Sequence, residues 1–243
     1  MKIFITDGSL KCFYTAVFYA YKYNGCIITS NKSVQLSFDS QVQMVHTEKD
    51  KSERVCSKIR QIDELVEDEI ALVLRSADPL KEQIAFEYIK LLIKQNRPIR
   101  NILSNPTVLE MNEIRQQVAK EIHNMHGFLR FMETAQGIMY APYSPDNDIT
   151  DLICHHFIRR FKSLKFVIHD LKRKKAVIYD GCNWFLTEVG EAEIYLSEYE
   201  KTFETLWKRY YKSVNIANRP HEKQMKGFMP VRYWKFLPEK KDN

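Results

Sequence analysis

The sequence predicts an α+β protein: a helical N-terminal half with a small sheet, then a C-terminal half with antiparallel hairpins, a long final helix and a basic tail. Apolar residues recur at helical spacing through residues 50–95, so helices dominate the first half. After Gly127, short runs of β-branched and aromatic residues come in adjacent pairs rather than one strand per helix. This pairing favours an antiparallel sheet over a doubly wound fold.

The individual elements follow from local patterns along the chain. Asp7-Gly8-Ser9 has the composition of a turn that caps the next helix, and Asn105-Pro106 opens a longer one. Strands are expected at residues 2–6, 26–28, 42–45, 128–133, 138–141, 166–169, 176–179 and 184–186. Helices are expected after Ser9, within 50–95, and over 106–125, 149–161 and 199–210.

The chain of 243 residues is expected to form a single domain, 1–243. Polar and proline-containing sequence at residues 96–106 marks a subdivision that the pattern also allows. It would separate a helical part with a small sheet, 1–100, from an α+β part with the basic tail, 101–243.

The composition argues against several classes of protein. The five cysteines are odd in number and form no Cys-x-x-Cys pair, which argues against a zinc ribbon or an iron–sulfur site. We therefore expect no metal and no cofactor. No apolar stretch approaches ~20 residues, and the N-terminal apolar run is too short for a signal peptide. A cytoplasmic protein without a membrane span is expected, with buried free thiols in a reducing compartment.

Basic charge is concentrated in two segments that are also rich in aromatic residues. Residues 155–175 hold eight Lys or Arg and one acidic residue, while residues 207–243 hold ten and three, so each segment carries +7 in a chain of +6. Cations attract phosphate and flat rings stack on bases, so the pairing indicates nucleic-acid binding in one continuous groove. The residues expected to hold phosphates or bases are Arg130, Arg159, Arg160, Lys172, Arg173, Arg219, Arg232, Tyr233 and Trp234.

Structural interpretations compete with these roles. Arg130, on an expected strand, is either a phosphate ligand or the partner of a nearby carboxylate. The charged loop at 172–175 is either a phosphate grip or simply solvated. His156 shares a helix face with Arg160, so it is either a general acid or base beside a bound phosphate, or a hydrogen-bonded core histidine. It is the one catalytic candidate, and the sequence leaves open whether the chain is an enzyme.

Several strings in the second half are specific in combination. They are Gly127-Phe128-Leu129-Arg130-Phe131, His155-His156-Phe157-Ile158-Arg159-Arg160-Phe161, Leu206-Trp207-Lys208-Arg209-Tyr210-Tyr211, Asn218-Arg219 and Met229-Pro230-Val231-Arg232-Tyr233-Trp234. In order and spacing they resemble an uncharacterised bacterial family described as probable DNA metabolism or DNA repair proteins. The resemblance implies a DNA context, a radical-SAM partner encoded beside the gene, and a link to uracil-DNA-glycosylase-type domains, which are fused to some relatives. It implies no catalytic mechanism.

The sequence therefore favours a DNA-binding protein of DNA repair or metabolism that acts with a radical-SAM partner. The alternative is a structural adaptor that docks the partner enzyme and binds little DNA itself. A stand-alone nuclease or base-excision enzyme is the third option. Nothing resembles the acidic cluster of a metal-dependent nuclease, because Asp146, Asp148 and Asp151 have the pattern of helix-capping residues.

Overall fold

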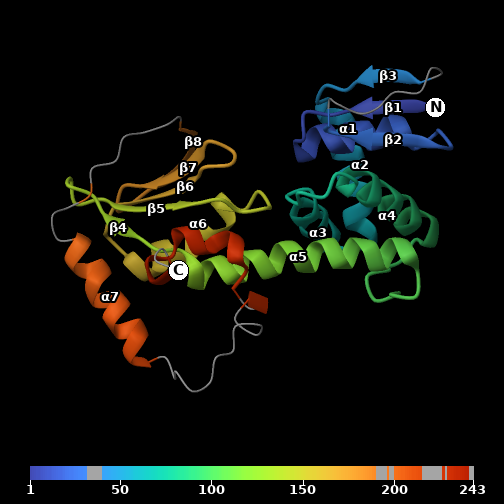
Figure 1. The fold of residues 1–243 in the computed structure, drawn as a ribbon. Coiled ribbons are helices and arrows are strands. Elements are labelled where there is room, and N and C mark those ends of the chain that lie inside the picture. The colour runs from blue at the N-terminus through green and yellow to red at the C-terminus, as the bar shows by residue number, and fades with distance from the viewer. Residues whose placement is uncertain (32–39, 190–195, 197–199, 215–225, 228, 241–243) are drawn as a thin grey trace. The chain divides into compact units, whose positions relative to one another are not determined.

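The computed structural model describes residues 1–31, 40–189, 196, 200–214, 226–227 and 229–240 (Figure 1). Its helices and sheets confirm the predicted α+β class. The chain forms two compact units, residues 1–119 and 120–243, and their boundary falls within helix α5 (Pro106–Phe128). Each unit has its own sheet. The expectation of one family domain over the whole chain stays a prediction.

The first unit contains a small parallel sheet and most of the helices (Figure 1). Strand β1 (Lys2–Ile5) is central and pairs in parallel with β2 (Cys26–Thr29) and with β3 (Gln41–Met44). Helix α1 (Leu10–Ala20) connects β1 to β2, because a parallel pair needs a crossover connection. The other helices of this unit are α2 (Lys49–Ile62), α3 (Val66–Val73), α4 (Lys81–Gln95) and the first part of α5.

The predicted turn before α1 is present and caps that helix. Gly8 has a φ of +84°, a conformation that glycine adopts without strain. The Ser9 hydroxyl accepts a hydrogen bond from the backbone N–H of Cys12 (3.3 Å). The helices then bury one hydrophobic cluster against the sheet, with Phe4 and Phe13 among its largest members.

The second unit is built on a mixed five-stranded sheet in the order β4-β5-β6-β7-β8 (Figure 1). β5 (Met139–Tyr143) and β6 (Phe166–Asp170) are parallel and are joined by α6 (Thr150–Phe161). The hairpins β6–β7 and β7–β8 are antiparallel, and the first is the hairpin expected between residues 166–169 and 176–179. The parallel pair β5–β6 makes this sheet mixed and not purely antiparallel as expected. The remaining elements are β4 (Met132–Glu133), β7 (Lys175–Tyr179), β8 (Trp184–Glu188), α7 (Glu200–Val214) and the 3-10 helices η1 (Val231–Phe236) and η2 (Pro238–Lys240).

The strand predicted over residues 128–133 is wrong for residues 128–131, because β4 covers only Met132–Glu133. α5 extends to Phe128, and the N–H of Leu129 still donates to the Met125 carbonyl (3.2 Å). Leu129 is buried and continues the apolar stripe of the helix. Its aromatic neighbours have high strand propensity, but a long amphipathic helix overrides local propensity. Arg130 therefore follows a helix end and does not lie on a sheet face.

An aromatic cluster fixes α6 in the second unit. Phe157 and Phe161 pack on Phe131, with ring centroids 5.0 and 4.7 Å away. Phe166 of β6 contacts Phe131 and Phe161, both at 5.9 Å. Since this face of α6 is covered, the exposed residues of the helix, His155, Arg159 and Arg160, lie away from it.

Candidate nucleic-acid interface

The carboxyl end of α6 carries a group of exposed cations. Phe157 is buried, and Arg159 and Arg160 lie off that face and are exposed. Lys162 and Lys165 follow the end of the helix and are exposed too. None of these four cations has an ion pair within the described part of the chain. Their charges are therefore available to an external anion.

An exposed tryptophan lies beside these cations. Trp184, the first residue of β8, is 37% exposed, and its ring meets the His155 ring edge to face at 5.4 Å. His155 lies one helical turn before Arg159, so the two side chains are neighbours on α6. An aromatic ring open to solvent and several cations thus share one surface, as proteins that bind single-stranded nucleic acid require.

The turn between β7 and β8 holds this arrangement together. The Tyr179 hydroxyl donates to the Lys162 carbonyl (2.7 Å). Gly181, with a φ of +101°, approaches Ser163 so closely that an added Cβ would lie 2.8 Å from the Ser163 carbonyl oxygen. The turn before Trp184 is therefore fixed against the end of α6. We call the resulting patch the α6 surface: His155, Arg159, Arg160, Lys162, Lys165 and Trp184.

His156 points into a different environment. Its ring stacks on that of His126, with centroids 4.2 Å apart and planes 13° apart. Burial and the nearby Arg160 and Arg159 lower the pKa of His156, while burial and the neighbouring His156 lower the pKa of His126. Both rings are thus neutral at pH 7. These contacts favour the structural interpretation of His156, and its catalytic role stays a prediction.

The later part of the first basic segment is held internally at the amino end of α6. Asp170 is fully buried and accepts the backbone N–H groups of Lys172 and Arg173 (2.9 and 3.2 Å). The Arg173 guanidinium donates to Asp170 (2.9 Å) and to the Asp146 carbonyl. A buried carboxylate needs such partners. Arg173 therefore has an internal structural role, and the contacts do not favour it as a phosphate ligand.

The two ends of α6 separate the cations of this segment. Lys175 pairs with Asp148, just before the helix starts, whereas Arg160 lies in its last turn. A 12-residue helix is about 18 Å long. The basic segment therefore forms two clusters about 18 Å apart. No cation of the cluster at the carboxyl end has an ion pair in the described residues, whereas in the other cluster Arg173 and Lys175 are ion-paired and Lys172 and Lys174 are exposed without one.

The basic tail packs onto the second unit through its tyrosine. Tyr233, expected to stack on a base, is only 3% exposed, and its hydroxyl donates to the buried Glu121. Glu121 also accepts from the backbone N–H groups of Asp146 and Asn147 (both 2.9 Å) and from the Asn147 side chain (2.7 Å). The structure thus gives Tyr233 a core role, and base stacking is not the role that these contacts favour.

The remaining predicted residues are dispersed. Arg232 is half exposed but pairs with Asp146 (2.7 Å), and the Trp234 indole donates to the Met229 carbonyl (3.0 Å). Arg130 donates to the Gly127 carbonyl (2.7 Å), and its guanidinium lies 5.4 Å from the Trp207 ring. Arg219 lies outside the described residues. One continuous groove through all the predicted residues stays a prediction.

Four members of the α6 surface are absent from the residues predicted to bind nucleic acid: His155, Lys162, Lys165 and Trp184. Lys162 and Lys165 were counted in the basic segment but were not singled out. Trp184 was expected only as part of a strand. The sequence does hold a signal for an exposed ring at Trp184, because Trp184, Phe185 and Leu186 are three consecutive large apolar residues on an edge strand. Successive strand residues point to opposite faces of a sheet, so the three cannot all be buried on one face.

Among the described residues, no group of His, Cys, Asp or Glu is arranged to hold a metal ion. In the same part of the chain, no helix has the length and hydrophobicity needed to cross a bilayer.

The fold and site define an α+β protein of two compact units with a cationic, aromatic surface in the second. Residues 79–239 match the model of a family described as a domain of unknown function, DUF4130, and the chain belongs to this family. The expected membership of an uncharacterised family is confirmed to this extent. No curated protein and no solved structure matches the chain.

Proposed function

We propose that this chain is a cytoplasmic nucleic-acid-binding protein of DNA repair or metabolism, and that it acts with a radical-SAM partner. The observation that carries the binding proposal is the α6 surface, where four exposed cations without ion pairs in the described residues lie at the carboxyl end of α6, and an exposed tryptophan contacts His155 of the same helix. Cations supply affinity for phosphates, and a tryptophan face supplies stacking to any base. Single-stranded DNA is the favoured substrate, because bases in a duplex are already stacked.

The test is fluorescence anisotropy with a labelled single strand and a duplex of the same sequence. Replacing Arg159 and Arg160 with Gln removes two phosphate contacts, so affinity falls and the magnitude of the salt slope decreases by about 1 for each arginine. Trp184→Ala weakens single-strand binding by about 1–3 kcal/mol. The control replaces Lys94 and Arg97, two exposed cations of the first unit, with Gln and so removes the same amount of charge. Equal losses in both double variants would contradict the proposed surface.

The adaptor function is supported by a separate observation on α7. Phe203 and Leu206 are 58% and 53% exposed on this helix, and Trp207 is 38% exposed. Exposed apolar patches of this kind are typical of protein-docking sites. Phe203→Ser and Leu206→Ser are expected to abolish co-purification with the radical-SAM protein and to leave DNA binding unchanged. Loss of both activities together would indicate misfolding.

A further inference from the structure

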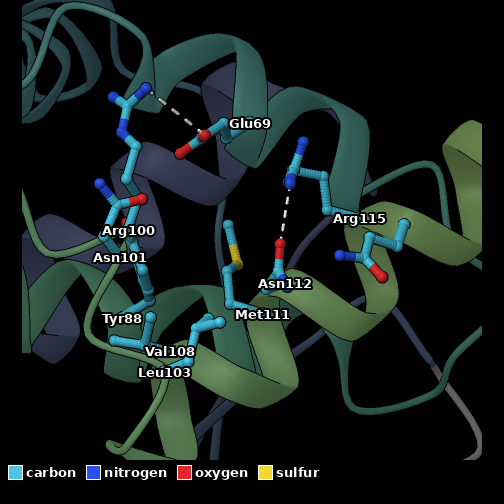
Figure 2. A pocket seen from close by; sticks show the side chains of 10 residues that line it. Glu69, Tyr88, Arg100, Asn101, Leu103, Val108, Met111, Asn112 and Arg115 are labelled. Carbon is cyan, nitrogen blue, oxygen red and sulfur yellow. Dashed lines mark hydrogen bonds and ion pairs between the residues drawn. The ribbon is translucent and has the colours of Figure 1, made fainter.

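A pocket in the first unit is lined by none of the residues assigned to nucleic acid. Its volume is about 260 Å³, and its lining comes from α3, α4, the segment after α4 and α5 (Figure 2). Leu103, Val108 and Met111 form its apolar part, while charged and polar side chains form the rest. The pocket is slightly smaller than typical ligand sites, which begin at about 300 Å³ and are mostly apolar with a few convergent polar groups.

The most informative polar group in this pocket is the Tyr88 hydroxyl. The Tyr88 side chain is 1% exposed, yet its hydroxyl has no hydrogen-bond partner in the described residues. Burial raises the pKa of Tyr88, and the carboxylate of Glu69 raises it further. A buried hydroxyl without a partner costs free energy, so such groups in native proteins require an explanation. An acceptor supplied by a ligand is the explanation that the pocket offers.

The second donor in the pocket is Arg115. Its guanidinium donates to the Asn112 side chain (2.8 Å), which orients it, as Figure 2 shows. Arg115 forms no ion pair with any described residue, whereas Arg100 on the same pocket pairs with Asp63 and lies 3.8 Å from Glu69. Arg100 is thus ion-paired within the protein, while Arg115 interacts with the Glu69 carboxylate only at longer range. Two donors that form no direct bond to a carboxylate of the described residues therefore line a pocket that has an apolar part.

We propose that this pocket binds a small molecule with an oxyanion at one end and a short aliphatic body. The oxyanion accepts hydrogen bonds from the Tyr88 hydroxyl and the Arg115 guanidinium, and the body packs on Leu103, Val108 and Met111. Arginine is well suited to this recognition because its planar fork matches a carboxylate or phosphate. Glu69 lines the same pocket and is the side chain that would accept an ammonium group on the same molecule, in competition with Arg100.

The test uses isothermal titration of the full chain with isovalerate, L-leucine and isoamylamine, which share one aliphatic body. We expect both carboxylates to bind and the amine not to bind. L-Leucine binding more tightly than isovalerate would place its ammonium group on Glu69; the reverse order would identify a simple carboxylate as the ligand class. Inorganic phosphate, which lacks the aliphatic body, is expected to bind more weakly than either carboxylate.

Tyr88→Phe and Arg115→Gln should each weaken carboxylate binding about tenfold or more, since each removes a hydrogen bond to a charged group. Tyr88→Phe should also raise the thermal midpoint of the free protein, because it removes an unsatisfied buried hydroxyl. Tyr14→Phe is the matched control: its hydroxyl is buried without a partner in the described residues but lies outside the pocket. It should raise the midpoint and leave binding unchanged. Absence of carboxylate binding, or equal binding by Tyr88→Phe, would refute the proposal.

Discussion

The buried carboxylate of Glu121 is the point at which the basic tail is fixed to the second unit, and its replacement is the sharpest test of the fold. Glu121 is 5% exposed and accepts four hydrogen bonds: one from Tyr233, one from Asp146 and two from Asn147. These donors come from η1 and from the loop between β5 and α6. Glu121→Gln keeps the shape of the side chain but replaces one acceptor oxygen with a donor NH2 group.

The loss in the free energy of unfolding follows from the number of donors that lose their acceptor. Whichever oxygen becomes the NH2 group, two of the four donors then face it. The Tyr233 hydroxyl can rotate and accept, so the favoured arrangement leaves the N–H of Asp146 without a partner. Hydrogen bonds to charged groups contribute about 1.5–3 kcal/mol each. Losing one and weakening the others should cost about 2–4 kcal/mol, or roughly 8–16 °C in the midpoint at about 4 °C per kcal/mol.

Urea and thermal unfolding followed by circular dichroism measure this change. Tyr233→Phe removes a single bond and should cost less than Glu121→Gln. Glu113→Gln, at an exposed position of the same helix, is the control and should change stability by less than about 0.5 kcal/mol. A loss below about 1 kcal/mol for Glu121→Gln would show that the carboxylate does not hold the tail.

Three further predictions concern the neighbourhood of α6. Folding lowers the pKa values of His126 and His156, so below about pH 6.5 the unfolded chain binds protons that the folded chain does not. The stability that the neutral rings contribute is therefore complete above that pH and is lost as the pH drops. Urea unfolding from pH 8 to pH 5 should show a smaller loss of stability when both histidines are replaced with Gln. Gly181→Ala should cost about 1–3 kcal/mol in the same assay, because the new Cβ meets Ser163 and the φ is positive, whereas Gly137→Ala, with a positive φ and open space, should cost less. The isolated protein should not process uracil-containing, alkylated or ultraviolet-damaged oligonucleotides with or without Mg²⁺; turnover that is lost in His156→Ala would make this histidine catalytic.

The elements of the fold were predictable because each has a strong local pattern. The alternation in residues 166–169 and 176–179 predicted the hairpin that forms β6 and β7, and helical periodicity predicted α6. The end of α5 was not predictable in the same way, since Leu129 satisfies both a helical stripe and strand alternation. Local patterns cannot decide such a case, because tertiary packing selects between them.

The residues of the site were harder to predict than the elements. Arg159 and Arg173 look equivalent in the sequence, as cations in one basic segment. They differ only because Asp170 is buried at the end of β6 and takes Arg173 as its partner. Tyr233 likewise looked like an exposed ring in a basic tail, and its burial depends on Glu121, far away in sequence. Long-range pairing of this kind leaves no periodic signal.

The salt dependence of DNA binding distinguishes the sequence-based from the structure-based account of the interface. The segment 155–175 contains eight cations, and if all of them met phosphates, the logarithm of duplex affinity would fall with that of salt with a slope of about −7. The structure leaves four of these eight on the α6 surface, for which the slope is about −3.6 on a duplex and about −2.8 on a single strand. In the other cluster, Arg173 and Lys175 are held by Asp170 and Asp148 and add to the slope only if those ion pairs open. Lys172 and Lys174 have no ion pair in the described residues and would bring the duplex slope to about −5.4 if they also met phosphates. A titration from 50 to 300 mM salt therefore measures how many charges of the basic segment remain available after folding, and a slope near −7 would show that the internal pairs of Arg173 and Lys175 are exchanged for phosphate.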